Sequence, residues 1–70
     1  MSHVVTVHTT PSVRVDEMRA GTIFRDNYGD EWRRGRRHGA HSGVYLATRL
    51  RDGYESCFAG CAKHVVHVDV

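Results

Sequence analysis

The sequence lacks several features that mark specialised classes of protein. It has two cysteines, one proline and one lysine in 70 residues, and no long apolar run. Two cysteines cannot build a dense disulfide framework, which favours a reducing compartment. The absence of a long apolar run argues against a signal or membrane segment. We therefore expect one small soluble domain, residues 1–70, in the cytoplasm and without a membrane partner.

Acidic residues are absent from residues 32–51, which instead hold six arginines. The other residues carry four basic and eight acidic groups, so this stretch has a charge of +6 and the remainder −4. Such asymmetry can steer an anionic partner to one side of a small protein. Arginine outnumbers lysine nine to one, which suits bidentate phosphate binding but also follows from a GC-rich genome. The six arginines are Arg33, Arg34, Arg36, Arg37, Arg49 and Arg51.

Apolar residues recur at every second position and β-branched residues dominate, a pattern typical of strands. Tight-turn residues separate the short segments, so we expect an all-β fold, a small SH3-like barrel of five to six short antiparallel strands. The first expected strand covers residues 3–8, is interrupted at Pro11 and resumes over residues 12–15. The others are residues 22–26, 30–34, 43–50, 54–59 and 63–70. Residues 1–11 either attach loosely within the chain or exchange into a neighbour, and a homodimer is one way to enlarge a thin core.

The inward-facing residues follow from this alternation. The expected core consists of Val5, Val7, Val13, Val15, Met18, Ile23, Phe24, Trp32, Val44, Leu46, Leu50, Phe58, Val66 and Val68. Met18 belongs to this set because a compact turn at residues 16–21 is expected to place it beneath the sheet. Tyr28, Tyr45 and Tyr54 are expected to be exposed, at separate loops and faces.

Gly29 fixes the register of the first hairpin. A three-residue loop places its last residue in the left-handed backbone region, which glycine adopts at low cost. The resulting register sets Phe24 opposite Trp32 on one face. It sets Arg25 opposite Glu31, an ion pair, on the other face.

The second hairpin is interpreted in the same way, with a three-residue loop at residues 51–53 that ends at Gly53. A two-residue loop would reverse the parity of the strands. The cross-strand pairs expected from the three-residue loop are Leu50–Tyr54, Arg49–Glu55 and Leu46–Phe58. Cys57 then lies on the outer face.

Residues 13–32, V-R-V-D-E-M-R-A-G-T-I-F-R-D-N-Y-G-D-E-W, resemble the opening of small SH3-like barrel proteins of actinobacteria and their phages. The matching positions are Val13, Val15, Gly21, Ile23, Gly29 and Trp32. The resemblance covers about half of the chain at most. It implies the barrel fold and a mobile-element or actinobacterial setting, and it implies no active site.

Residues 32–38, W-R-R-G-R-R-H, form the main candidate binding site. Their arginines are expected to lie in a loop, flexed by glycine, that could follow a phosphate backbone, with an aromatic side chain offering a stacking face. The first expectation is a protein partner, bound by an adaptor or inhibitor of the kind that phages encode. Nucleic-acid binding is the alternative. The candidate residues are Arg33, Arg34, Arg36, Arg37, Trp32 and His38.

Cys57, Cys61, His64 and His67 are residue types that suit zinc, but their spacing argues against a metal site. In an extended chain the two cysteines lie about 13 Å apart, and the two histidines point to opposite faces. The same distance argues against a disulfide. We expect no metal, no cofactor and no catalytic residue, so the chain is not expected to be an enzyme.

Overall fold

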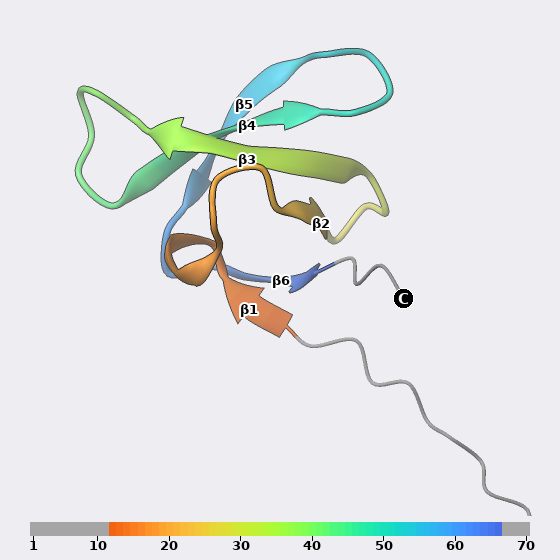
Figure 1. Ribbon diagram of the computed structural model, residues 1–70, viewed down its shortest axis with the longest axis horizontal. Helices are drawn as coiled ribbons and strands as arrows, with labels where there is room; N and C mark the ends of the chain where they lie inside the picture. The colour runs from red at the N-terminus through yellow and green to blue at the C-terminus, as the bar shows by residue number, and fades with distance from the viewer. Residues whose placement is uncertain (1–11, 67–70) are drawn as a thin grey trace, which may run out of the picture.

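The computed structural model describes residues 12–66, which form six β-strands and one short 3-10 helix (Figure 1). The all-β expectation is confirmed. The elements are β1 (Ser12–Arg14), η1 (Val15–Glu17), β2 (Ile23–Arg25), β3 (Glu31–Arg37), β4 (Val44–Arg49), β5 (Glu55–Ala59) and β6 (Lys63–Val66). Over this range no helix is long and apolar enough to cross a membrane. The strand expected at residues 3–8, the exchange of residues 1–11 and the expected end of the last strand lie outside the described residues.

All six strands belong to one antiparallel sheet in the order β1-β6-β2-β3-β4-β5. β6 pairs with both β1 and β2, so it links β1 to the other four strands of the sheet. The turn after β5 approaches η1, where the N–H of Asp16 donates to the carbonyl of Gly60 at 3.0 Å. Between residues 12 and 66, however, no strand pairing joins β1 to β5. The sheet is therefore open over this range, and closure into a barrel is not confirmed.

The core is small and mainly aromatic. Its buried residues are Val15, Met18, Phe24, Trp32, Tyr45 and Ala47, with Val13, Phe58 and Val66 packed against them. The ring of Phe58 makes edge-to-face contacts with Phe24 and Trp32, at centroid distances of 5.1 and 4.9 Å. Met18 lies in the core directly after η1, as expected from the turn. A core of this size makes each buried aromatic ring important for stability.

The register expected for the first hairpin is confirmed. Phe24 pairs with Trp32 and Arg25 pairs with Glu31. Gly29 has a φ of 87°, the left-handed conformation that a side chain would strain. The local sequence is sufficient here because the loop length and the alternation of apolar residues favour the same register.

The register expected for the second hairpin is wrong by one residue. The N–H of Arg49 donates to the carbonyl of Tyr54 at 2.8 Å, which closes a four-residue turn over residues 50–53. The observed pairs are Tyr45–Phe58, Leu46–Cys57, Ala47–Ser56 and Thr48–Glu55.

This one-residue shift reverses which side chains of β4 face the core. Tyr45 and Ala47 are buried, whereas Leu46 is only partly buried and Leu50 is 41% exposed. The expected core positions of the two leucines, and the expected exposure of Tyr45, are therefore wrong. Cys57 does lie on the outer face, as expected, and is exposed.

Candidate functional site

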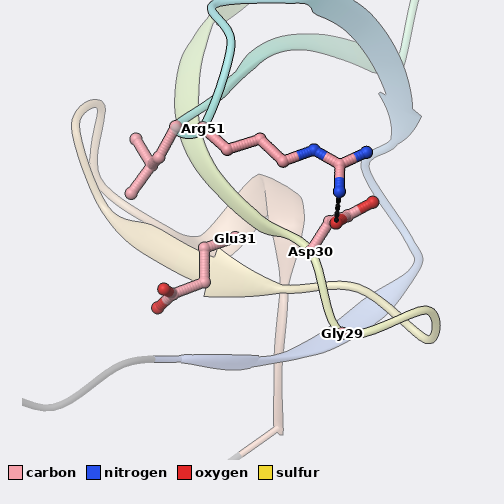
Figure 2. Close-up of a pocket in the computed structure, with 5 residues that line it drawn as sticks. Gly29, Asp30, Glu31 and Arg51 are labelled. Carbon is pink, nitrogen blue, oxygen red and sulfur yellow. Dashed lines mark ion pairs between the residues drawn. The ribbon is translucent and has the colours of Figure 1, made fainter.

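Arg51 is neutralised by an aspartate of the first hairpin. Its Nη1 lies 3.3 Å from Oδ1 of Asp30, beside a hollow of about 340 Å³ that the two hairpin turns line (Figure 2). Glu31 and Leu50 also line this hollow. Because the hollow combines two carboxylates with an arginine that is already paired, it is a poor site for an anion.

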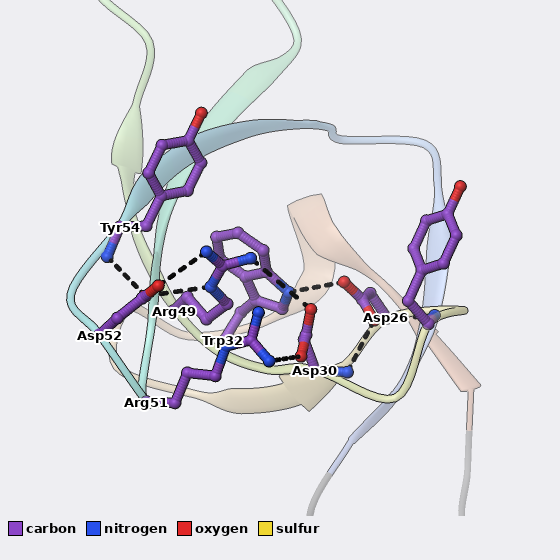
Figure 3. Close-up of polar contacts among 8 residues, drawn as sticks. Asp26, Asp30, Trp32, Arg49, Arg51, Asp52 and Tyr54 are labelled. Carbon is purple, nitrogen blue, oxygen red and sulfur yellow. Dashed lines mark hydrogen bonds and ion pairs between the residues drawn. The ribbon is translucent and has the colours of Figure 1, made fainter.

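Arg49 occupies the centre of a larger network (Figure 3). Its Nε and Nη2 donate to the two carboxylate oxygens of Asp52 at 3.0 and 2.7 Å. Its Nη1 lies 3.6 Å from Oδ2 of Asp30. The guanidinium carbon also lies 5.5 Å from the ring of Trp32 and 5.1 Å from the ring of Tyr54, within the range of cation–π attraction. Two of the six arginines are thus used within the fold.

The Arg49–Asp52 pair predicts a measurable pKa. The hydrogen bonds from Arg49, together with one from the N–H of Tyr54, lower the pKa of Asp52 from 3.8 to about 2. Arg49→Gln should return it toward 3.8, since the charged donor is lost. A carboxyl NMR titration of the two proteins checks this. An unchanged Asp52 pKa in the variant would show that the pair does not form in solution.

The sign of the linked stability change follows from the direction of the shift. Because the pKa of Asp52 is lower in the folded state, its contribution to stability is complete above pH 3.8. That contribution is lost as the pH falls toward 2. Since the pair is exposed, solvent screens it and the effect is small.

Trp32 does not provide the stacking face expected from the sequence. It is only 4% exposed, and its Nε1 donates to Oδ2 of Asp26 at 2.8 Å (Figure 3). Oδ1 of Asp26 accepts the backbone N–H groups of Tyr28 and Asp30, both at 2.9 Å. Trp32 is therefore part of the core, anchored by the turn that precedes its strand.

Asp26 is a structural residue that the sequence interpretation missed. Burial raises the pKa of its carboxyl, but hydrogen bonds from Trp32, Asp30 and Tyr28 outweigh burial and lower the pKa below the usual value. An aspartate at the start of a turn commonly accepts the N–H two residues later. The sequence Asp-Asn-Tyr-Gly carried that signal.

β3 extends to Arg37, so the four clustered arginines lie on a strand rather than in the expected loop. Arg33, Arg36 and Arg37 are exposed, and Arg34 is half-buried. Among the described residues, none of these four guanidinium groups forms an ion pair. We call Arg33, Arg34, Arg36 and Arg37 the β3 arginines. Unlike Arg49 and Arg51, they are not neutralised by a carboxylate within residues 12–66.

A β-bulge distributes the β3 arginines over both faces of the sheet. Arg34 pairs with Ala47 and Arg37 with Tyr45, which leaves two residues of β3 opposite one residue of β4. Paired residues point to the same face, so Arg34 and Arg37 share the face of the buried Tyr45. The two pairs are Arg34 with Arg37 on this face and Arg33 with Arg36 on the other.

Gly35 permits the bulge. A Cβ at this position would lie 3.1 Å from the carbonyl oxygen of Leu46, a tight contact with backbone. Beside the bulge, the guanidinium carbon of Arg34 lies 4.1 Å from the centroid of the Tyr45 ring. The Nε of Arg34 is buried and has no hydrogen-bond partner within residues 12–66. The arginine therefore covers the tyrosine while one of its donors remains unused.

His38 follows directly on β3. Its N–H donates to the carbonyl of Val44 at 2.7 Å, which continues the β3–β4 pairing by one residue. Its Nδ1 accepts the N–H of Ala40 at 3.1 Å. The ring also lies 4.8 Å from the ring of His41. The loop between β3 and β4 thus places His38 beside Arg37, as the sequence suggested, and adds a second imidazole.

Cys57, Cys61 and His64, the described members of the candidate zinc set, are not gathered into a metal site. Cys57 and Cys61 are free and exposed. The ring of His64 packs against Phe24 and Phe58, at centroid distances of 5.3 and 5.4 Å. Within residues 12–66 no three side chains of His, Cys, Asp or Glu are grouped so that they could hold a metal ion. His67 lies outside that range.

Comparison of the chain with protein-family models, curated proteins and solved structures found no match. Function therefore has to be inferred from the β3 arginines and their surroundings.

Proposed function

We propose that this chain is a small, non-enzymatic binding module whose β3 arginines bind the phosphate backbone of a nucleic acid. The observation that carries the proposal is that four guanidinium groups lie along one short strand without a neutralising carboxylate among the described residues. Arginine presents planar, bidentate donors that suit phosphate oxygens. In contrast, the arginines near the β4–β5 turn are neutralised by Asp30 and Asp52.

A strand is a suitable element for this task. Its residues rise about 3.3 Å each, so the two β3 arginines on each face, which are three residues apart, extend over roughly 10 Å along the strand, enough to contact successive phosphates. No stacking residue has to be assumed, because phosphate contacts alone supply sequence-independent affinity. The proposal therefore does not depend on Trp32, which is buried.

A protein partner is the second candidate, and the edge of β5 is the observation that favours it. β5 ends the sheet within residues 12–66, and an extended peptide can add a strand to such an edge. Of the exposed large apolar residues, Tyr28 lies in the β2–β3 turn, Leu50 and Tyr54 lie in the β4–β5 turn, and Val65 lies in β6. They offer less support for a hydrophobic interface than the β3 arginines offer for an anionic one.

The finer fold and the setting belong to the same proposal. An SH3-like barrel is supported by β6, which pairs with two strands, and by the contact between the turn after β5 and η1. The free, exposed thiols of Cys57 and Cys61 are consistent with a reducing cytoplasm. The resemblance of residues 13–32 to actinobacterial and phage barrels suggests the same setting.

The proposal is tested by replacing all four β3 arginines with alanine. The variant should bind a single-stranded or duplex oligonucleotide about a hundredfold or more weakly than the wild type at low salt, because its phosphate contacts are removed. Fluorescence anisotropy measures the affinity.

The matched control removes four positive charges elsewhere, as Arg14→Ala, Arg19→Ala, Arg51→Ala and Lys63→Ala. All four of these residues are exposed, and the control has the same net charge as the β3 variant. It should keep most of the affinity. Equal losses in the two variants would mean that net charge, rather than β3, determines binding. Equal affinity of the β3 variant and the wild type would reject the proposed interface.

A further inference from the structure

The loop between β3 and β4 forms a hollow that continues from the β3 arginines. Its volume is about 390 Å³, and it is lined by Arg37, His38, Gly39, Ala40, His41, Ser42 and Gly43. This volume lies at the lower end of the range for small-ligand sites. In Figure 1 the loop projects from the end of β3 that lies opposite the β2–β3 turn.

The hollow is rich in donors and has no carboxylate in its lining. Arg37 supplies a guanidinium that forms no ion pair within the described part of the chain. Nδ1 of His38 accepts the N–H of Ala40, so the ring nitrogen that can donate to a ligand is Nε2. The adjacent imidazole of His41 and the hydroxyl of Ser42 complete the set.

The contrast with the hollow at Arg51 shows which chemistry fits. That hollow has a similar volume, about 340 Å³, but Asp30 and Glu31 line it, and Asp30 already pairs with Arg51. A bound anion would meet two carboxylates there. At the β3–β4 loop it would meet only donors, so this loop is the better anion site of the two.

The number of donors favours a phosphate with three free oxygens. A carboxylate and a backbone phosphodiester each present two free oxygens, which together accept about four hydrogen bonds. The fork of Arg37 supplies two donors, and His38, His41 and Ser42 supply one each, so the set exceeds two oxygens and matches the three of a terminal phosphate.

We propose that the hollow of the β3–β4 loop binds the terminal phosphate of a nucleic-acid strand. This inference rests on the proposed function, because the β3 arginines would hold the adjoining backbone. The strand end would lie at Arg37, and the chain of phosphates would continue along β3.

The test compares three oligonucleotides of one sequence: 5′-phosphorylated, 3′-phosphorylated and without a terminal phosphate. The full chain should bind one of the phosphorylated forms about tenfold more tightly than the unmodified form, the effect of one or two charge-assisted hydrogen bonds. The phosphorylated oligonucleotide that binds more tightly identifies whether the 5′ or the 3′ end is bound. Equal affinity for all three would overturn the inference while leaving the proposed function intact. Failure of all three to bind would reject both.

A paired variant locates the effect. His41→Ala with Ser42→Ala should remove the preference, measured as the ratio of the affinities for the phosphorylated and unmodified strands. Asn27→Ala with Tyr28→Ala, in the exposed turn between β2 and β3, should retain it. A preference that persists in the first variant would contradict the assignment to this loop. Heteronuclear NMR spectra of both variants establish that the fold is kept.

Discussion

Phe24→Ala should lower the free energy of unfolding of this protein by about 3–5 kcal/mol. Phe24 is fully buried, pairs with Trp32 on β3 and Val66 on β6, and contacts the ring of Phe58 edge-to-face. It therefore lies where β2 meets both β3 and β6. A domain of this size typically has a total stability of only about 4–10 kcal/mol. The variant should thus be largely unfolded at moderate urea concentrations, with a Tm lower by about 15 °C or more.

Urea denaturation followed by tryptophan fluorescence measures this loss, since Trp32 lies in the same cluster. Tyr28→Ala is the matched control, because it removes another aromatic ring from the same hairpin at a position that is 93% exposed. Its free energy of unfolding should change by less than about 0.5 kcal/mol. A loss below about 1 kcal/mol for Phe24→Ala would show that the aromatic cluster is not the core of the protein.

Asp26→Asn should lower the free energy of unfolding by about 2–3 kcal/mol at neutral pH. The carboxylate accepts three hydrogen bonds, two from backbone N–H groups and one from the buried Nε1 of Trp32. An asparagine can still accept the two backbone bonds with its carbonyl oxygen, but its amide then faces Nε1 of Trp32, and two donors meet. Leaving a buried donor without an acceptor accounts for the expected loss. Asp16→Asn, which weakens only the exposed pair with Arg14, should cost less than about 1 kcal/mol.

The same substitution changes the acid sensitivity of the fold. Because the pKa of Asp26 is lower in the folded protein than its usual value of 3.8, the unfolded chain takes up this proton first as the pH falls. The contribution of Asp26 is therefore present above pH 3.8 and is lost as the pH falls through its folded pKa. Urea midpoints measured between pH 6 and pH 3 should fall less steeply for Asp26→Asn than for the wild type. Parallel curves would contradict the hydrogen-bonded carboxylate.

The alternation of apolar residues explains why the register of the first hairpin could be predicted and that of the second could not. In the first hairpin only one parity places large apolar side chains on one face, and Gly29 fixes the loop. In the second, both parities of β4 are apolar, since Tyr45 and Ala47 alternate with Val44 and Leu46. The sequence around Gly53 is compatible with either turn length.

Contacts distant in sequence decide the second register. The N–H of Leu50 donates to the carbonyl of Glu31 at 3.0 Å, which draws the end of β4 onto β3. Tyr45 packs beneath Gly60, where an added Cβ would lie 3.1 Å from its ring. Because these contacts join separate elements, the local alternation of β4 does not encode them.

The candidate site was predictable in composition but not in geometry. The absence of carboxylates from residues 32–51 singled out the basic stretch. The expected partner of Arg49, Glu55, is wrong: Arg49 pairs with Asp52 of its own turn and with Asp30 of the other hairpin. Arg51 also pairs with Asp30, a contact between hairpins that local alternation does not encode. Nor does it encode the bulge at Gly35, which depends on the close approach of the Leu46 carbonyl.

The central claim, that the β3 arginines bind phosphates, is tested most directly by the salt dependence of oligonucleotide affinity. Each phosphate contact contributes a slope of roughly −0.7 to −0.9 to a plot of log K against log salt concentration. Because each face of the sheet carries two β3 arginines, a strand bound along one face predicts a slope of about −1.4 to −1.8 for the wild type, and a slope near zero is expected for whatever binding remains when all four β3 arginines are alanine. A wild-type slope near zero, or the same slope in both proteins, would contradict the account.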